Sequence, residues 1–380
     1  MKKFKQTIEE AIEQMVMRYI LEHKEKKLFN LQEALDLGLV PHLKGAKVYS
    51  GKTSDCVSEN ADGKKLYNKD GNEVILMVRS SRISTHDIGR GTIPFKDQIQ
   101  SLINNLMHGI IRHLADYSLI ELYTVKPGSP VSLHHNLDQF LIEAVLRTHL
   151  PKANTSTSMY KNVIELQKTT FSGIDFRPYL ENLVINGKLP FPVDSPSTKD
   201  VEHDITVAPE YFVEHGICTP LEYRIINNIS WLCYGAVSEY LRRIGLLLLD
   251  TKLEFGKRKS NGHIMISDEI FTPDSSRFWK IDERGTIQTD ENDQPISFSK
   301  EFARGISKDK RQYNDDERLA IAVRYIQSYE FIARQKFVPD MRSEEEKVLR
   351  DLRKAVKEGG IRFGKKKAEK KNEKMTEITN

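Results

Sequence analysis

The chain has 380 residues, of which 39% are hydrophobic and 29% charged, a balance typical of a folded globular protein and not of a disordered or fibrous one. Its formal net charge of +4 does not call for a nucleic-acid partner, and its three cysteines form no C-x-x-C motif. No apolar run approaches the ~18 residues of a membrane-spanning helix, and Glu9, Glu10 and Glu13 interrupt the N-terminal apolar pattern that a secretory signal needs. We therefore expect a cytoplasmic protein with neither a membrane nor a nucleic acid as its partner.

The N-terminus carries apolar side chains at helical spacing over residues 4–23, which predicts an amphipathic helix. A second, shorter helix is expected to begin after Asn30 and to stop at Gly38. Neither helix carries a cluster of reactive side chains. They either pack on the body of the protein or mediate self-association into a homo-oligomer.

Residues 47–57 are typical of a strand, a glycine turn and a second strand, and residues 73–78 of a further strand. Together they predict a small antiparallel sheet. At the turn, Gly51 would let backbone amides approach a phosphate, and Lys52 could reach the same phosphate. An ordinary hairpin turn is the alternative, because the loop lacks the spacing of a Walker A motif.

Residues 81–87, with the sequence SRISTHD, precede a glycine-containing loop and a helix predicted over residues 96–114. Asp87 at the mouth of that loop could hold a metal or a ribose hydroxyl, or cap the loop locally. Strands are expected at residues 119–123, 130–133 and 141–147.

A loop punctuated by prolines follows at residues 195–204 and carries Lys199 ahead of a Glu-His-Asp cluster. Such a loop favours a binding site over a core position. Thr219, Pro220 and Glu222 then predict a capped helix that ends at Gly245. Its expected buried stripe consists of Ile225, Ile229, Leu232, Ala236, Tyr240 and Ile244.

The stretch from residue 246 to residue 279 predicts an antiparallel hairpin that begins with four consecutive leucines. Because strand side chains alternate, Asp250, Lys252 and Glu254 should share one face. Carboxylates from two facing strands can hold Mg2+, while Lys252 and Arg277 can neutralise phosphate. The alternative is the charged, solvated face of an ordinary hairpin.

Three blocks of this stretch, DTKLEFG at 250–256, DE at 268–269 and TPDSSRFW at 272–279, resemble the signature of the SAICAR synthetase family. Further blocks resemble that family in the same order over about residues 47–335. Two positions and one loop depart from the pattern. Ser54 stands where the family has a basic residue and Ser81 where it has an acid, and the loop after Arg147 lacks the family glycines.

The resemblance implies an ATP- and Mg2+-dependent ligase of purine biosynthesis. Such an enzyme joins L-aspartate to the carboxylate of CAIR (carboxyaminoimidazole ribonucleotide) through an acyl phosphate and releases SAICAR, ADP and phosphate. It also implies an α+β fold with an ATP-grasp-like nucleotide site between a small antiparallel sheet and a larger α+β part. We expect four parts: a helical extension (1–45), the nucleotide-binding sheet (46–125), the catalytic part (126–340), and a C-terminal helix with a lysine-rich tail (341–380).

The site residues follow from the motifs and the resemblance. Those expected to act in catalysis are Asp250, Lys252 and Arg277. Those expected to bind ATP are Gly51, Lys52, Lys199 and Glu254, and the metal ligands are Glu254 and Asp268. Those expected to bind substrate are Asp87, Arg147, Ser156, Ser158, Asp274, Ser276, Arg277, Lys300 and Arg304. Asp274 is expected either to orient Arg277 or to contact substrate.

Two alternatives remain at this point. The altered loop at residues 148–158 suggests a related ligase with a different carboxylate or amine. Ser54 and Ser81 suggest a non-catalytic homologue, although the clustered charges around Glu254 argue against it, because a site without function has no reason to keep them.

Overall fold

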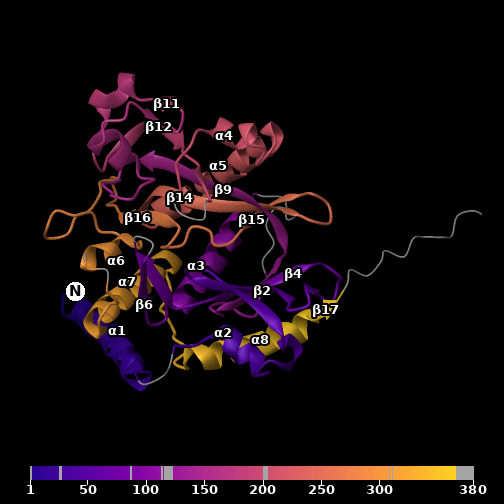
Figure 1. Cartoon of the computed structure of the whole chain (residues 1–380). Helices are drawn as coiled ribbons and strands as arrows, with labels where there is room; N and C mark the ends of the chain where they lie inside the picture. The colour runs from indigo at the N-terminus through magenta and orange to yellow at the C-terminus, as the bar shows by residue number, and fades with distance from the viewer. Residues whose placement is uncertain are drawn as a thin grey trace, which may run out of the picture.

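The computed structural model describes residues 2–24, 28–85, 88–112, 114, 123–199, 204–307, 309 and 311–364. Over these ranges the fold is α+β, as expected, with antiparallel pairing in both of its large sheets (Figure 1). Asp87, the expected strand at 119–122, and the lysine-rich tail from residue 365 lie outside the described residues. None of the described helices is long and apolar enough to cross a bilayer.

The first sheet has the strand order β17-β3-β2-β4-β8-β7, with β1 paired to β2. Its strands are β1 (Ala46–Ser50), β2 (Ser54–Asn60), β3 (Lys65–Tyr67), β4 (Val74–Arg79), β7 (Tyr123–Thr124), β8 (Val131–His135) and β17 (Arg362–Gly364). Two helices, α2 (Leu31–Asp36) and α8 (Glu344–Gly359), lie against it at one end of the molecule (Figure 1). Leu35, Leu76 and Val348 belong to the shared core.

This sheet contains strands from both sides of the boundaries expected at residues 125 and 340. Strand β8 comes from beyond the first boundary, and α8 and β17 come from beyond the second. Backbone hydrogen bonds join β8 to β4 and β17 to β3, so segments distant in the sequence complete one sheet. The C-terminal helix is thus part of the small sheet's own core.

The second sheet has the order β12-β9-β14-β15, with β13 paired to β9 and β16 paired to β14. Its strands are β9 (Leu137–His149), β12 (Lys188–Asp194), β13 (Ser197–Thr198), β14 (Leu246–Arg258), β15 (Ile264–Ser267) and β16 (Ser276–Lys280). The helices packed around it are α1 (Lys2–Glu22), α3 (Lys96–Ile111), α4 (Pro209–Glu214), α5 (Pro220–Arg243), α6 (Glu301–Ile306) and α7 (Asp315–Ala333). Two short hairpins pair β5 (Arg82–Thr85) with β6 (Ile88–Thr92), and β10 (Thr170–Phe171) with β11 (Ile174–Asp175).

Helix α1 packs on the body of the protein, one of the two possibilities that the sequence left open. Val16 and Ile20 are buried in the same apolar core as α3 and α7, and the Tyr19 ring lies 4.4 Å from the ring of Phe95. This packing accounts for the apolar stripe over residues 12–20 of α1 without a second copy of the chain.

Helix α5 has the expected capping box, formed by Thr219 and Glu222, but the expected buried stripe is wrong by about one position. Leu232 is 47% exposed. The residues that are buried instead are Ile226, Ile229, Ser230, Cys233, Tyr234, Val237 and Leu241. Both series repeat at helical spacing, so only the packing of α5 against β14 and β9 selects between them.

Asp194, at the end of β12, contacts α5, so a substitution of Asp194 tests this packing. Its Oδ2 accepts hydrogen bonds from Tyr223 Oη (2.7 Å) and Asn227 Nδ2 (2.6 Å), while Oδ1 is enclosed with no partner among the described residues. Burial raises the pKa of Asp194 to about 6. The folded state therefore binds the proton more tightly than the unfolded state, and stability is lost as the pH rises through the folded pKa.

We expect Asp194→Asn, which keeps the acceptor oxygen, to gain stability over the wild type as the pH rises. The gain should grow by on the order of 2 kcal/mol between pH 4 and pH 8. Urea unfolding of both proteins across this range measures it. Every other group titrates alike in the two proteins, so a pH-independent difference would contradict the prediction.

Candidate functional site

The site is built on β14, the strand between β9 and β16. Asp250 lies opposite Arg147 of β9 and Arg277 of β16, and Glu254 lies opposite Glu143 of β9. The apolar Leu253 and Phe255 belong to the core. The hairpin and its alternating faces, predicted from the sequence, are therefore confirmed.

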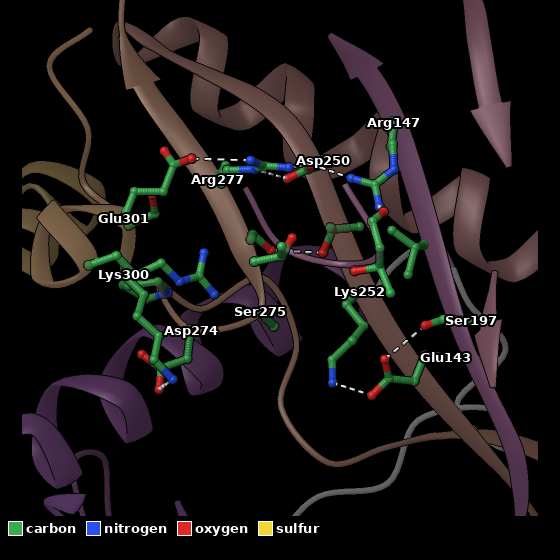
Figure 2. Close-up of a pocket in the computed structure, with 18 residues that line it drawn as sticks. Glu143, Arg147, Ser197, Asp250, Lys252, Asp274, Ser275, Arg277, Lys300 and Glu301 are labelled. Carbon is green, nitrogen blue, oxygen red and sulfur yellow. Dashed lines mark hydrogen bonds and ion pairs between the residues drawn. The ribbon is translucent and has the colours of Figure 1, made fainter. Parts of the chain in front are cut away.

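A first cavity, about 150 Å³ in volume, lies where these strands meet the turn before β16 and the start of α6 (Figure 2). We call it the arginine cavity, because Arg147, Arg277 and Arg304 line it together with Lys252 and Lys300. Such a concentration of cations suits a small molecule with several negative charges.

Asp250 holds two of these arginines in place. Its Oδ1 accepts from Arg277 Nε at 2.9 Å, and its Oδ2 accepts from Arg147 Nη1 at 3.0 Å (Figure 2). Arg277 also donates to Glu301 Oε1 (3.1 Å), and Arg147 to Ser195 Oγ (2.8 Å). Burial acts against the ionised carboxylate, but the two arginines outweigh it and lower the pKa of Asp250. Both guanidinium planes are thus fixed before a ligand arrives.

A second cavity of about 650 Å³ lies between the two sheets, and we call it the inter-sheet cavity. One side carries Gly51 and Lys52 from the β1–β2 turn, and the other carries Lys199, Glu254 and Asp268. Apolar side chains also line it: Ile75, Met77, Leu137, Met265 and Ile266. An apolar wall beside a charged end suits a ligand that joins a flat base to phosphates.

The two cavities adjoin, because Glu143, Lys252, Asp274 and Lys300 line both. Lys252 Nζ donates to Glu143 Oε1 at 2.5 Å and lies 3.6 Å from Glu254 Oε1. Burial disfavours the charged amine, yet Glu143 and Glu254 outweigh it and raise the pKa of Lys252. Lys252 therefore keeps its positive charge at the junction, where ligands of the two cavities would meet.

The position of Asp274 fits only one of the two roles expected for it. It does not contact Arg277, which is held by Asp250 and Glu301; its Oδ2 lies 2.9 Å from Lys96 Nζ, and its Oδ1 accepts from Tyr325 Oη. The turn before β16 directs its carboxylate towards α3 and α7, so that the orienting role is wrong and a substrate contact stays a prediction. Burial opposes the ionised form, but Lys300, Lys96 and Tyr325 together lower the pKa of Asp274.

The expected metal ligands, Glu254 and Asp268, come together at the charged end of the inter-sheet cavity. Glu254 forms ion pairs with Lys199 and Lys252. Burial, and then the negative charge of Glu254, raises the pKa of Asp268. A divalent cation would relieve this repulsion, so the two carboxylates fit Mg2+. Within the described ranges no group of three or more His, Cys, Asp or Glu side chains is placed to hold a metal ion by itself.

The loop after Arg147 presents threonines to the arginine cavity in place of the expected serines. Thr155 and Thr157 line the cavity, whereas Ser156 is exposed and the Oγ of Ser158 accepts the Lys161 N–H at 3.4 Å. Ser158 itself is buried just before the short helix Tyr160–Glu165 and does not line the cavity. The other expected residues Ser276, Lys300 and Arg304 do line this cavity.

Sequence reasoning missed Glu143, Ser197 and Glu301. Glu143 lies four residues before Arg147 on one strand, so the alternation of side chains would have placed both on the same face. Ser197 donates to Glu143 Oε2 at 3.0 Å, and Glu301 holds Arg277. Ser197 lies in the proline-punctuated loop at residues 195–204 that favoured a binding site, whereas no local signal marks the role of Glu301.

Comparisons with known proteins identify the family of this chain. A family model described as SAICAR synthetase matches residues 60–319. The phosphoribosylaminoimidazole-succinocarboxamide synthase of Legionella pneumophila (strain Paris) is 30% identical over 303 residues, which cover 75% of this chain and 93% of that protein.

Two solved structures share the fold. The SAICAR synthase of Saccharomyces cerevisiae, complexed with SAICAR, has a TM-score of 0.60 at 20% identity and covers 77% of this chain and 97% of its own. A SAICAR synthetase in complex with ADP has a TM-score of 0.54 at 20% identity and covers 77% of this chain and 100% of its own.

Proposed function

The chain belongs to the SAICAR synthetase family, the ATP-dependent ligases of one step of purine biosynthesis, and on that premise we propose that it joins L-aspartate to the carboxylate of CAIR. The products are SAICAR, ADP and phosphate. One observation carries the proposal: an inter-sheet cavity suited to a nucleotide adjoins a cation-lined cavity suited to an anionic substrate, with Lys252 at their junction.

The inter-sheet cavity takes ATP. Its apolar wall packs against the base, and the amines of Lys52 and Lys199 receive the phosphates. Gly51 leaves room for them beside the turn, while its own N–H donates to the carbonyl of Ser54 at 2.7 Å. Glu254 and Asp268 would hold Mg2+ beside those phosphates, where the ion supplies charge neutralisation for phosphoryl transfer. A SAICAR synthetase of the same fold is in complex with ADP, which supports nucleotide binding by this chain.

The arginine cavity takes the anionic substrates. CAIR carries a phosphate and a carboxylate, and aspartate carries two carboxylates, so that Arg147, Arg277 and Arg304 with Lys300 match their charge. Thr155 and Thr157 add hydroxyl donors to this cavity. The altered loop at residues 148–158 therefore still offers polar contacts to the same substrate, and a different substrate is not needed to explain it.

Lys252 acts where the reacting groups meet. A carboxylate is a poor electrophile towards an amine, and transfer of the γ-phosphoryl group to it gives an acyl phosphate that the aspartate amine can attack. Negative charge builds on the transferred oxygens during both steps, and the fixed ammonium of Lys252 stabilises it. Asp250 supports these steps by holding Arg147 and Arg277.

The test is ADP release from the purified protein with ATP, Mg2+, CAIR and L-aspartate, each omitted in turn. We expect release only when all four are present, with SAICAR formed in equal amount. Release that persists without CAIR or without aspartate would replace this proposal by one with a different carboxylate or amine.

Two further parts of the proposal concern the protein in the cell, namely a cytoplasmic location and a homo-oligomer. Cell fractionation tests the first and light scattering of the purified protein the second. Recovery in a membrane-enclosed compartment, or a monomer at working concentration, would contradict the respective part.

A further inference from the structure

Helix α8 lies beyond the segment that matches the family model, yet it contacts the backbone that leads into β5. The N–H of Ser81 donates to Glu344 Oε1 at 3.0 Å. The hydroxyl of Ser81 donates to Asp97 Oδ1 at 3.2 Å, and Asp97 Oδ2 lies 2.7 Å from Lys347 Nζ. Asp97 and Lys347 are both fully buried, so α8 and the start of α3 hold this segment jointly.

The same segment, residues 80–82, forms hydrogen bonds with the glycine turn between β1 and β2. The N–H and the Oγ of Ser80 both donate to the carbonyl of Thr53 at 2.9 Å. Arg82 Nη2 donates to the carbonyl of Gly51 at 3.2 Å, and the two terminal nitrogens of Arg82 donate to Asp55 at 3.1 and 2.7 Å. The main chain on both sides of Lys52 is therefore anchored to residues 80–82.

Glu344 is not needed to start its own helix. Ser343 and Glu346 form the capping box of α8, which leaves the Glu344 carboxylate for Ser81. Burial, and then the charge of Asp97, raises the pKa of Glu344 to about 7. A carboxylate in so unfavourable an environment is one that the fold has a reason to retain.

We propose that Glu344, supported by the buried pair of Lys347 and Asp97, is a positioning residue for nucleotide binding. It fixes residues 80–82, which fix the turn at residues 51–55 that receives the phosphates of ATP. A turn ordered in advance loses less conformational entropy when it binds. This inference rests on the proposed function, because the role of the turn is part of that proposal.

The test compares Glu344→Ala and Glu344→Gln with Glu345→Ala, a variant of the exposed neighbour in the same helical turn. The Kd for ATP is measured by calorimetry, and kcat and the KM values are measured with saturating co-substrates. We expect Glu344→Ala to raise the Kd and the KM for ATP about tenfold, since an unpaired N–H at Ser81 loosens the segment, with kcat changed by less than about twofold.

Glu344→Gln should stay within about twofold of the wild type, because its amide oxygen can still accept from Ser81. The control Glu345→Ala should not differ from the wild type. Should Glu344→Ala not fold, Glu344→Asp replaces it, because the shorter side chain withdraws the carboxylate from Ser81 and should weaken ATP binding similarly.

Several results would overturn the inference. One is an unchanged Kd for ATP in a folded Glu344→Ala protein. Another is an equal rise in the KM for ATP, CAIR and aspartate with a lowered melting temperature, which is the signature of a merely structural helix. If the wild type itself bound no ATP, the proposed function would fail first, so that the two failures are distinguishable.

Discussion

Glu254→Gln is expected to lower kcat for ADP release on the order of 10³-fold, the largest effect on activity that we predict. Glu254 is buried at the charged end of the inter-sheet cavity, where its carboxylate joins Lys199, Lys252 and Asp268. The amide keeps the volume of the side chain but loses the charge that would bind Mg2+. Steady-state kinetics over a series of Mg2+ concentrations measures the effect, and the remaining activity should require more Mg2+ than the wild type.

The control is Asp138→Ala, a carboxylate of the same sheet whose side chain is 66% exposed and lies outside both cavities. It should leave kcat and the Mg2+ requirement unchanged. A Glu254→Gln enzyme with the Mg2+ dependence of the wild type would remove Glu254 from the metal site.

Asp250→Ala is expected to cost about 3–5 kcal/mol of unfolding free energy, the largest loss of stability that we predict. The substitution leaves two buried guanidinium groups, those of Arg147 and Arg277, without their shared carboxylate. Removing one partner of a buried ion pair is costly because the remaining charge stays out of water. Urea unfolding monitored by tryptophan fluorescence measures it.

The matched control is Asp175→Ala, which breaks an arginine–carboxylate pair with Arg177 on the surface. Solvent screens that pair, so the unfolding midpoint should not move measurably. Because the arginines lower the pKa of Asp250, its contribution is present above the ordinary value of 3.8 and is lost as the pH falls below it. The difference between the wild type and Asp250→Asn should therefore shrink in acid, and a difference that stays constant would contradict this account.

Local sequence was sufficient wherever a function depends on neighbours along one strand or one helical turn. The alternation of Asp250, Lys252 and Glu254 follows from the geometry of any strand. The cap at Thr219 follows from the unsatisfied N–H groups at the start of any helix. For the same reason the order of the main helices and strands could be predicted, whereas the α+β class was implied by the resemblance to the SAICAR synthetase family.

Tertiary packing decided which side chains face inward wherever the local sequence allows two equally regular arrangements. Helix α5 carries two apolar series, and only its contact with β14 and β9 buries Ile226 and exposes Leu232. The loop after Arg147 alternates threonine and serine, and only the folded structure shows that Thr155 and Thr157, and not Ser156 and Ser158, line the cavity.

The sequence by itself placed Asp250, Lys252 and Glu254 on one face of one continuous strand, and the resemblance of its motifs to the SAICAR synthetase family indicated the chemistry. Only the tertiary structure decided which distant residues complete the site. Glu143 reaches Lys252 from another strand, and Glu344 reaches Ser81 across 263 positions of the chain. Hydrogen bonds and ion pairs depend on the distance between atoms in space. Two residues far apart in the sequence come within that distance only when the two sheets and their helices pack together, so the sequence pattern does not reveal such pairs.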